Sequence, residues 1–298
     1  MKYVIGKIRY SLYKFLVDHY PRAIIDRSWK LKFGHSIDWK HPRDINEKIQ
    51  WLICYGDTSR WPTLADKYTV REFVAEKGYG NLLTKLYGVW DDAGKIDFDA
   101  LPEKFVLKCT HDSASYHIVD KKKGYNKELL VLDLNYHLNN KYGYQSCEPH
   151  YNRIKPRIIA EEYLHSSTDS SISSSLIDYK VWCFGGSPFC ICVYYGRDKS
   201  GAFINVYDLN WNVHPEYSVF TEHYRDGKGL VPKPNNLPDM LKAASVLSQG
   251  LPQARIDFYI VDGKIYFGEI TLTSNAGRMD NFTDEFLIRM GDQVDLPK

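Results

Sequence analysis

The chain has 298 residues, of which 44% are hydrophobic and 26% charged, a composition typical of a globular protein with one large or two smaller domains. Its formal charge is only +2, which argues against nucleic acid as a partner of the whole molecule. Its six cysteines lack paired spacing, its first residues are too charged for a signal peptide, and no apolar run approaches the roughly 18 residues of a membrane span. We therefore expect reduced thiols and a cytoplasmic protein.

The first part of the chain is basic and helical in pattern. Residues 1–43 contain ten Lys or Arg and three Asp, and apolar residues recur at helical spacing between Ile5 and Leu16. Such a helix either packs its apolar stripe on the adjoining domain or lies, through residues 1–20, on an anionic membrane surface at the inner face of the membrane. We expect another helix from Asp44 through Leu52, and thus a helical N-terminal region over residues 1–60.

The next segment combines a predicted helix, a strand and a polar loop. Residues 66–74 read as a helix that ends near Gly78. Residues 102–109 predict a short apolar strand that contains Lys108, and a lysine in a buried strand requires an anion. That anion is either a carboxylate in a structural salt bridge or a nucleotide phosphate. The small polar residues 110–115 follow; their amides and hydroxyls could face an anion, although they include no glycine and match no Walker motif.

Strands dominate the second half of the chain. Residues 157–164 predict a strand that ends in acids, and the serine-rich residues 165–175 predict a mobile surface loop. Asp178 and Lys180 fall on one face of the next predicted strand because side chains alternate with a period of two. Further predicted elements are strands at 178–184, 189–195 and 203–207 and a helix at 239–247.

An acidic pair lies in the last predicted hairpin. Two β-like runs, residues 255–259 and 266–271, flank an Asp262-Gly263 turn signal. Asp257 and Glu269 can then lie on neighbouring strands, on the same face, among Phe, Tyr and Ile. Unpaired charges would be costly there, so a cation between the two carboxylates, such as Mg²⁺, would explain them. The alternative is a pair of solvent-facing acids on an ordinary hairpin.

The order helix, strand, loop, strand, hairpin, helix, hairpin predicts an α+β fold with mostly antiparallel strands. The same succession of segments, from about residue 40 to the C-terminus, resembles the ATP-grasp fold. More narrowly, it resembles the TupA-like ATP-grasp amidoligases that are encoded with bacterial surface-polysaccharide genes. The segments that carry the resemblance are Asp66-Lys67, Phe105–Lys108, Ala160–Leu164, Asp178–Lys180, Arg255–Tyr259 and Phe267–Thr271. The resemblance implies two α+β lobes, residues 61–162 and 163–298, that clamp a nucleotide between them.

The resemblance also implies roles for individual residues. Those that would bind ATP are Lys67, Lys108 and Ser113 near the phosphates, Glu161, Glu162, Tyr163 and Leu164 near adenine, and Glu162 or Asp178 at the ribose. Those that would line the phosphate and acyl-phosphate region as catalytic residues are Lys180, Arg197 and Arg255. Those that would hold Mg²⁺ are Asp257, Glu269 and Thr271.

Three places depart from the family pattern. Thr271 stands where many ATP-grasp enzymes have Asn. Asp112 and Ala114 stand in a loop that is glycine-containing in the family, and Thr273-Ser274 replaces a Pro-Gly pair. Asp112 would be unfavourable beside a triphosphate unless its carboxylate faces a metal, solvent or an amine substrate. These changes leave room for altered specificity or weaker nucleotide binding.

The resemblance implies ATP-dependent joining of a carboxylate to an amine through an acyl phosphate. The expected acceptor is a uronic acid or amino sugar of a bacterial surface glycan, as a sugar nucleotide or lipid-linked sugar, and the expected amine is an amino acid or another small amine. A glycan kinase would use the same nucleotide site. A non-catalytic module that binds glycan or a membrane complex is the alternative from another class. A glycosyltransferase is disfavoured, because no convincing Asp-x-Asp metal motif lies beside a nucleotide-sugar fold.

Overall fold

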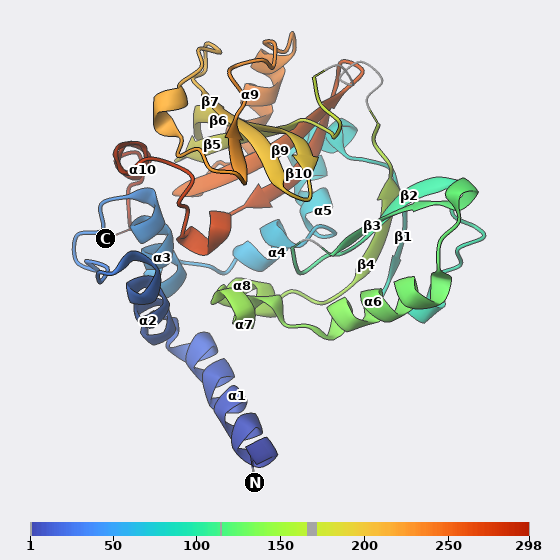
Figure 1. Cartoon of the computed structure of the whole chain (residues 1–298), viewed down its shortest axis with the longest axis horizontal. Helices are drawn as coiled ribbons and strands as arrows, with labels where there is room; N and C mark the ends of the chain where they lie inside the picture. The colour runs from blue at the N-terminus through green and yellow to red at the C-terminus, as the bar shows by residue number, and fades with distance from the viewer. Residues whose placement is uncertain (1, 114, 166–171, 298) are drawn as a thin grey trace.

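Two β-sheets form the framework of the protein (Figure 1). The computed structural model describes residues 2–113, 115–165 and 172–297, with the backbone alone at residues 2–9. The first sheet has the order β1-β4-β2-β3, and the second has the order β10-β9-β5-β6-β7-β8. All strand pairs are antiparallel except β7 with β8, which confirms the predicted α+β class.

The first sheet comes from the middle of the chain. Its strands are β1 (Leu86–Trp90), β2 (Lys104–Cys109), β3 (Tyr116–Asp120) and β4 (Ile158–Glu162). In β2, Phe105, Leu107 and Cys109 are buried in a hydrophobic core shared with helix α6 (Lys127–Asn139). Because side chains alternate along a strand, Lys104, Val106 and Lys108 lie on the face of the sheet away from α6.

The second sheet carries the acidic hairpin. Its strands are β5 (Asp178–Phe184), β6 (Ser187–Asp198), β7 (Gly201–Tyr207), β8 (Tyr224–Asp226), β9 (Gln253–Val261) and β10 (Lys264–Thr271). Asp262 and Gly263 both have positive φ, as a two-residue hairpin of the predicted kind requires. An irregularity at Gly268 shifts the register so that Glu269 lies directly opposite Asp257. The predicted hairpin and its paired carboxylates are therefore present.

Helices surround the two sheets. They are α1 (Lys2–His19), α2 (Pro21–Phe33), α3 (Ile45–Tyr55), α4 (Trp61–Ala65), α5 (Val70–Val74), α6, α7 (Tyr142–Ser146), α8 (Pro149–Asn152), α9 (Leu237–Leu247) and α10 (Asp284–Gly291). Single helical turns lie at Ala75–Tyr79, Gly80–Leu82, Ala93–Lys95, Lys121–Lys123, Pro215–Tyr217 and Ser274–Gly277. The helix α9 packs on β5, β6 and β9, whereas α1 projects from the rest of the molecule (Figure 1).

One predicted helix is wrong in its extent. Residues 66–74 do not form one helix, because α4 ends at Ala65 and α5 begins at Val70. Between them the Asp66 carboxylate accepts a hydrogen bond from the Tyr68 amide at 2.9 Å, so a turn replaces the first helical turn. This turn orients Lys67. The predicted serine-rich loop lies partly outside the described residues, which exclude 166–171.

The cysteines and the helices agree with the expectations drawn from composition. All six cysteines are free thiols. Within the described residues, no helix is long and apolar enough to cross a membrane.

Candidate active site

Asp257 lies at the centre of a buried cluster of charges on the second sheet. Its side chain is 2% exposed, and Lys180 on the neighbouring strand donates to Oδ2. Arg255 donates to both carboxylate oxygens, from Nε and Nη2, at 2.7 Å each. Burial alone would raise the pKa of Asp257, but Arg255 and Lys180 outweigh it and lower the pKa below its usual value. The carboxylate is therefore held ionised by two cations.

The three predicted metal ligands converge on one point. The Nη2 atom of Arg255 lies 2.7 Å from Asp257 Oδ2, 3.3 Å from Glu269 Oε1 and 3.0 Å from Thr271 Oγ1. The Thr271 hydroxyl also donates to Glu269 Oε1 at 2.9 Å. Oxygen atoms of this kind suit Mg²⁺, which binds a few protein oxygens and completes its shell with phosphate and water. A cationic nitrogen already occupies the point where they meet, so the donor set fits a cation.

This donor set is small. Among the residues that the structure describes, no three His, Cys, Asp or Glu side chains gather in a way that could hold a metal ion. The candidate set contains two carboxylates and one hydroxyl; the Glu269 side chain is 44% exposed, Thr271 is half-buried and Asp257 is buried. A metal held here would depend on phosphate oxygens for the rest of its ligands.

A second cluster of charges lies on the first sheet, around Glu161. Its buried carboxylate accepts from Lys108 Nζ at 2.5 Å and from Arg71 Nη1 at 2.8 Å. Burial works to raise the pKa of Glu161, but Lys108 and Arg71 lower it below the usual value. Of the two anions expected for Lys108, the structure shows a carboxylate, that of Glu161. The cluster has one more positive charge than negative.

Lys67 joins the two clusters. It lies in the turn between α4 and α5, and α4 packs against β10. Its ammonium group donates to the backbone carbonyl of Asp112, and burial lowers its pKa, although Glu269 and Asp112 oppose this shift. Glu269 is therefore close enough to act electrostatically on Lys67, and the fold brings together residues that are far apart in the sequence.

The polar loop after β2 differs from the expectation at Asp112. Its carboxylate is 2% exposed; Ser115 Oγ donates to Oδ1, and His137 Nδ1 lies 3.0 Å from Oδ2. The acid does not face solvent, and its partners are a hydroxyl and an imidazole. Ser113 is exposed, and Ala114 lies outside the described residues.

The remaining predicted nucleotide residues lie at the ends of β4 and β5. Asp178 accepts from Arg197 Nε at 2.9 Å and Nη2 at 2.7 Å. Glu162 accepts from the Lys85 amide at 3.2 Å, so both acids predicted for a ribose already have partners. Tyr163 lies under the ammonium group of Lys104, which is 3.9 Å from the ring centroid. Leu164, the last of this group, is partly buried.

Sequence reasoning missed a wall of the site formed by α7 and α8. The rings of Tyr142 and Tyr151 meet edge to face at 5.1 Å, and Glu269 lies close enough to contribute to the raised pKa of both. Glu148, between these helices, accepts from Thr273 just after β10, and burial raises its pKa to about 7. Arg71 was also missed. No motif marks these residues, because their roles depend on long-range packing.

The first sheet has an excess of lysine and arginine around Glu161, and the second sheet has converging oxygen ligands. Together they define an α+β protein with a candidate site for phosphates and a cation. The chain belongs to the TupA-like ATP-grasp family, whose model matches residues 47–295. No curated protein is similar enough in sequence to count as a match.

Solved ligases are similar to parts of the chain. A D-alanine–D-alanine ligase from Bacillus anthracis, complexed with ATP, is 15% identical at a TM-score of 0.39, over 70% of this chain and 54% of that one. An L-amino acid ligase from Bacillus licheniformis is 13% identical at a TM-score of 0.47, over 78% and 49%. A D-alanine–D-alanine ligase from Helicobacter pylori is 13% identical at a TM-score of 0.44, over 84% and 67%. The chain thus spans about half the length of the first two proteins.

Proposed function

We propose that the protein is an ATP-dependent carboxylate–amine ligase. The observation that carries this proposal is the position of Lys67. It lies in the turn after α4, which packs on β10 of the acidic hairpin, and it binds the backbone carbonyl of Asp112 after the lysine-bearing strand β2. Cations suited to phosphate and oxygen ligands suited to a divalent ion thereby share one site. Membership of the ATP-grasp family supports the same reaction.

Different residues would bind the different parts of Mg·ATP. Lys67 and Lys108 would bind the phosphates from the side of the first sheet, within a lobe of residues 61–162. Asp257, Glu269 and Thr271, in the lobe of residues 163–298, would hold Mg²⁺, which neutralises phosphate charge when bound. The backbone of residues 161–164 would contact adenine, with Glu162 or Asp178 at the ribose and Ser113 near the phosphates.

Ligation would then proceed in two steps, phosphorylation of the carboxylate and attack by the amine. A carboxylate oxygen of the substrate attacks the γ-phosphorus of ATP, and ADP leaves. The amine attacks the carbonyl carbon of the resulting acyl phosphate; phosphate leaves with the C–O bond electrons, and the amine loses a proton. Lys180, Arg197 and Arg255 would stabilise the charge that develops on the transferred group, an effect worth about 3 kcal/mol per donor.

The substrate classes follow from the family resemblance and from the walls of the site. A uronic acid or amino sugar of a bacterial surface polysaccharide would be one substrate, and an amino acid or small amine the other. The tyrosines of α7 and α8 offer aromatic rings near Glu269, as sugar binding often requires. The exposed Leu12 and Phe15 of the projecting helix α1, with the basic charge of residues 1–43, support contact with an anionic membrane surface.

The direct test is incubation with Mg·ATP and candidate pairs of amines and uronic acids. Release of ADP and phosphate together with an amide of the expected mass supports the ligase. A stable phosphorylated sugar without free phosphate would instead identify a kinase. Absence of any stabilisation by saturating Mg·ATP, which should add a few kcal/mol for a real ligand, would contradict nucleotide binding altogether.

A further inference from the structure

His111 and Asp112, in the loop that follows β2, are held from outside the candidate site by the C-terminal end of α6. His111 Nε2 lies 3.1 Å from the carbonyl of Asn140, which caps this helix. His137, in the last turn of α6, binds the carboxylate of Asp112. The helix on the far face of the first sheet therefore contacts the loop at two successive residues.

Asp112 links this helix to Lys67. His137 Nδ1 lies 3.0 Å from Oδ2 of Asp112, and a carboxylate oxygen accepts the hydrogen bond that an imidazole N–H donates. The other carboxylate oxygen accepts from Ser115, whose hydroxyl in turn accepts from the Cys109 amide at 3.3 Å. With its side chain fixed in this way, Asp112 presents its backbone carbonyl to the ammonium group of Lys67.

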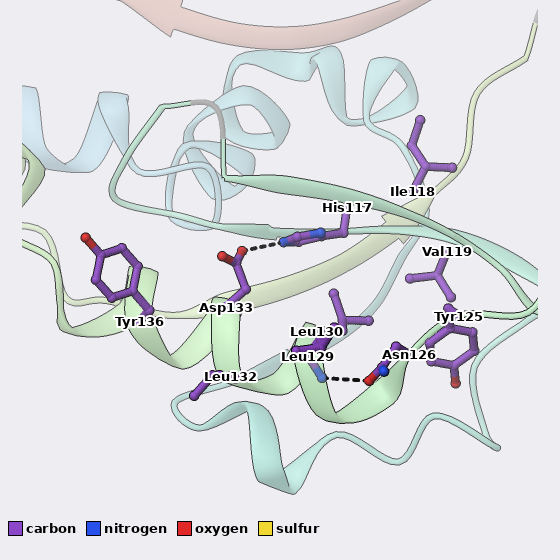
Figure 2. A pocket seen from close by; sticks show the side chains of 10 residues that line it. All are labelled: His117, Ile118, Val119, Tyr125, Asn126, Leu129, Leu130, Leu132, Asp133 and Tyr136. Carbon is purple, nitrogen blue, oxygen red and sulfur yellow. Dashed lines mark hydrogen bonds and ion pairs between the residues drawn. The ribbon is translucent and has the colours of Figure 1, made fainter.

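A row of side chains leads from Asp112 toward the surface through His137, Asp133 and His117. His137 Nε2 lies 3.8 Å from Asp133 Oδ2, and His117 Nε2 lies 2.8 Å from the same oxygen. His117 and Asp133 line a groove of about 710 Å³ between β3 and α6, where Figure 2 shows them pointing toward each other. Side-chain exposure is 2% for Asp112, 25% for His137, 47% for Asp133 and 32% for His117, so the buried end of the row is Asp112.

We propose that Asp112 and His137 are positioning residues for nucleotide binding, which act through Lys67. The inference rests on the proposed function. Asp112 is a structural anchor: its carboxylate binds His137 of α6, and its carbonyl fixes the ammonium group of Lys67, which would meet the phosphates. Loss of the anchor frees Lys67 and the loop together, so nucleotide affinity falls while the groups that take part in the chemistry stay in place.

The test compares variants of His137 in the full chain. His137→Leu removes the donor and should raise both the Kd and the KM for Mg·ATP about tenfold, which corresponds to about 1.4 kcal/mol, with kcat nearly unchanged. His137→Asn keeps a nitrogen donor near the position of Nδ1 and should restore most of the affinity. His117→Asn is the matched control, because it alters only the outer end of the row and should leave the Kd unchanged.

The outcomes separate the two proposals. If the unmodified protein binds no Mg·ATP, the proposed function fails. If it binds Mg·ATP and His137→Leu binds equally well, the positioning role is wrong. An equal loss of affinity in His137→Leu and His137→Asn, accompanied by an equal fall in Tm, would show a purely structural histidine and would also overturn the inference.

Discussion

The two sheets each bury one acid between two cations, yet the surroundings of the two acids differ. On the first sheet Glu161 is bound by Lys108 and Arg71, whose side chains are 24% and 15% exposed. On the second sheet Asp257 is bound by Lys180 and Arg255, whose side chains are 12% and 16% exposed. The second cluster also includes Glu269, which balances its charge.

This difference explains how one site can accept both signs of charge. The cluster around Glu161 carries an excess positive charge, which suits phosphate oxygens. The cluster around Asp257 is balanced, and the half-exposed Glu269 can still accept a cation. A nucleotide with a divalent ion needs both a positive cluster for its phosphates and an acid for its metal. We therefore expect changes in the first cluster to affect phosphate binding and changes in the second to affect metal binding.

The largest effect is expected when the exposed acid of the second cluster is neutralised. Glu269→Gln should lower ATP turnover about 10³-fold, because the divalent ion that would neutralise transition-state charge loses a carboxylate ligand. The fold should persist, since the side chain is 44% exposed. Phosphate release measured beside Glu222→Gln, a change at an exposed acid of the same type, checks the result. Normal turnover in Glu269→Gln would sink the metal assignment.

Removal of the buried acids should affect stability instead. Asp257→Asn leaves two buried cations without their carboxylate and should reduce the free energy of unfolding by about 3–5 kcal/mol. Glu161→Gln should cost less, because Lys108 is the most exposed of the four cations and can reach water. Urea unfolding of both variants gives the comparison, with Asp91→Asn as control for an exposed pair that solvent screens. Equal losses in the three variants would contradict the role of burial.

The sequence predicted the second cluster better than the first, for a physical reason. An Asp-Gly turn and alternating side chains determine the hairpin locally and place both acids in it. A regular register would set Asp257 opposite Gly268, and only the irregularity at Gly268 brings Glu269 opposite Asp257. The role of Arg255 as the cation that joins them was not foreseen, although the residue lies in the same strand. Its neighbours are determined by the register between β9 and β10, which an irregularity at Gly268 shifts.

The first cluster and the walls of the site depend on contacts between distant segments. Arg71 reaches Glu161 across 90 residues of sequence. We did not predict the strands β1 and β3 or the helices α6 to α8. In α6, apolar residues lie on both the buried and the exposed side, so its sequence shows no clear apolar stripe at helical spacing. The turn that contains Lys67 also escaped prediction. The Asp66 carboxylate accepts a hydrogen bond from the Tyr68 amide, and this Asx turn competes with the start of a helix.

A buried acid outside both clusters provides a pH test. Glu148 has no lysine or arginine as hydrogen-bond partner among those described, and burial raises its pKa from 4.5 to about 7. A raised pKa means that the stability contributed by the neutral acid is complete below about pH 4.5 and is lost as the pH rises through about 7. The shift corresponds to about 3 kcal/mol at pH 8.

Glu148→Gln should therefore match the unmodified protein near pH 4 and exceed its free energy of unfolding by about 3 kcal/mol at pH 8. The amide oxygen can still accept from Thr273. The difference between the two proteins at each pH is the quantity to measure, because His150, whose pKa burial lowers to about 3, loses stability in the opposite direction as the pH falls. A constant difference across this range would contradict the raised pKa.

The smallest effect on stability is expected for Arg197, which forms another acid–cation pair on the second sheet. It binds Asp178 through two nitrogens but is 50% exposed, so solvent screens the pair. Arg197→Gln should change the free energy of unfolding by less than about 1 kcal/mol, against the larger loss expected for Asp257→Asn. A loss as large as that of Asp257→Asn would show that two-nitrogen geometry, and not burial, decides the strength of these pairs. Unchanged stability together with slower ligation would assign Arg197 to the chemistry of the site.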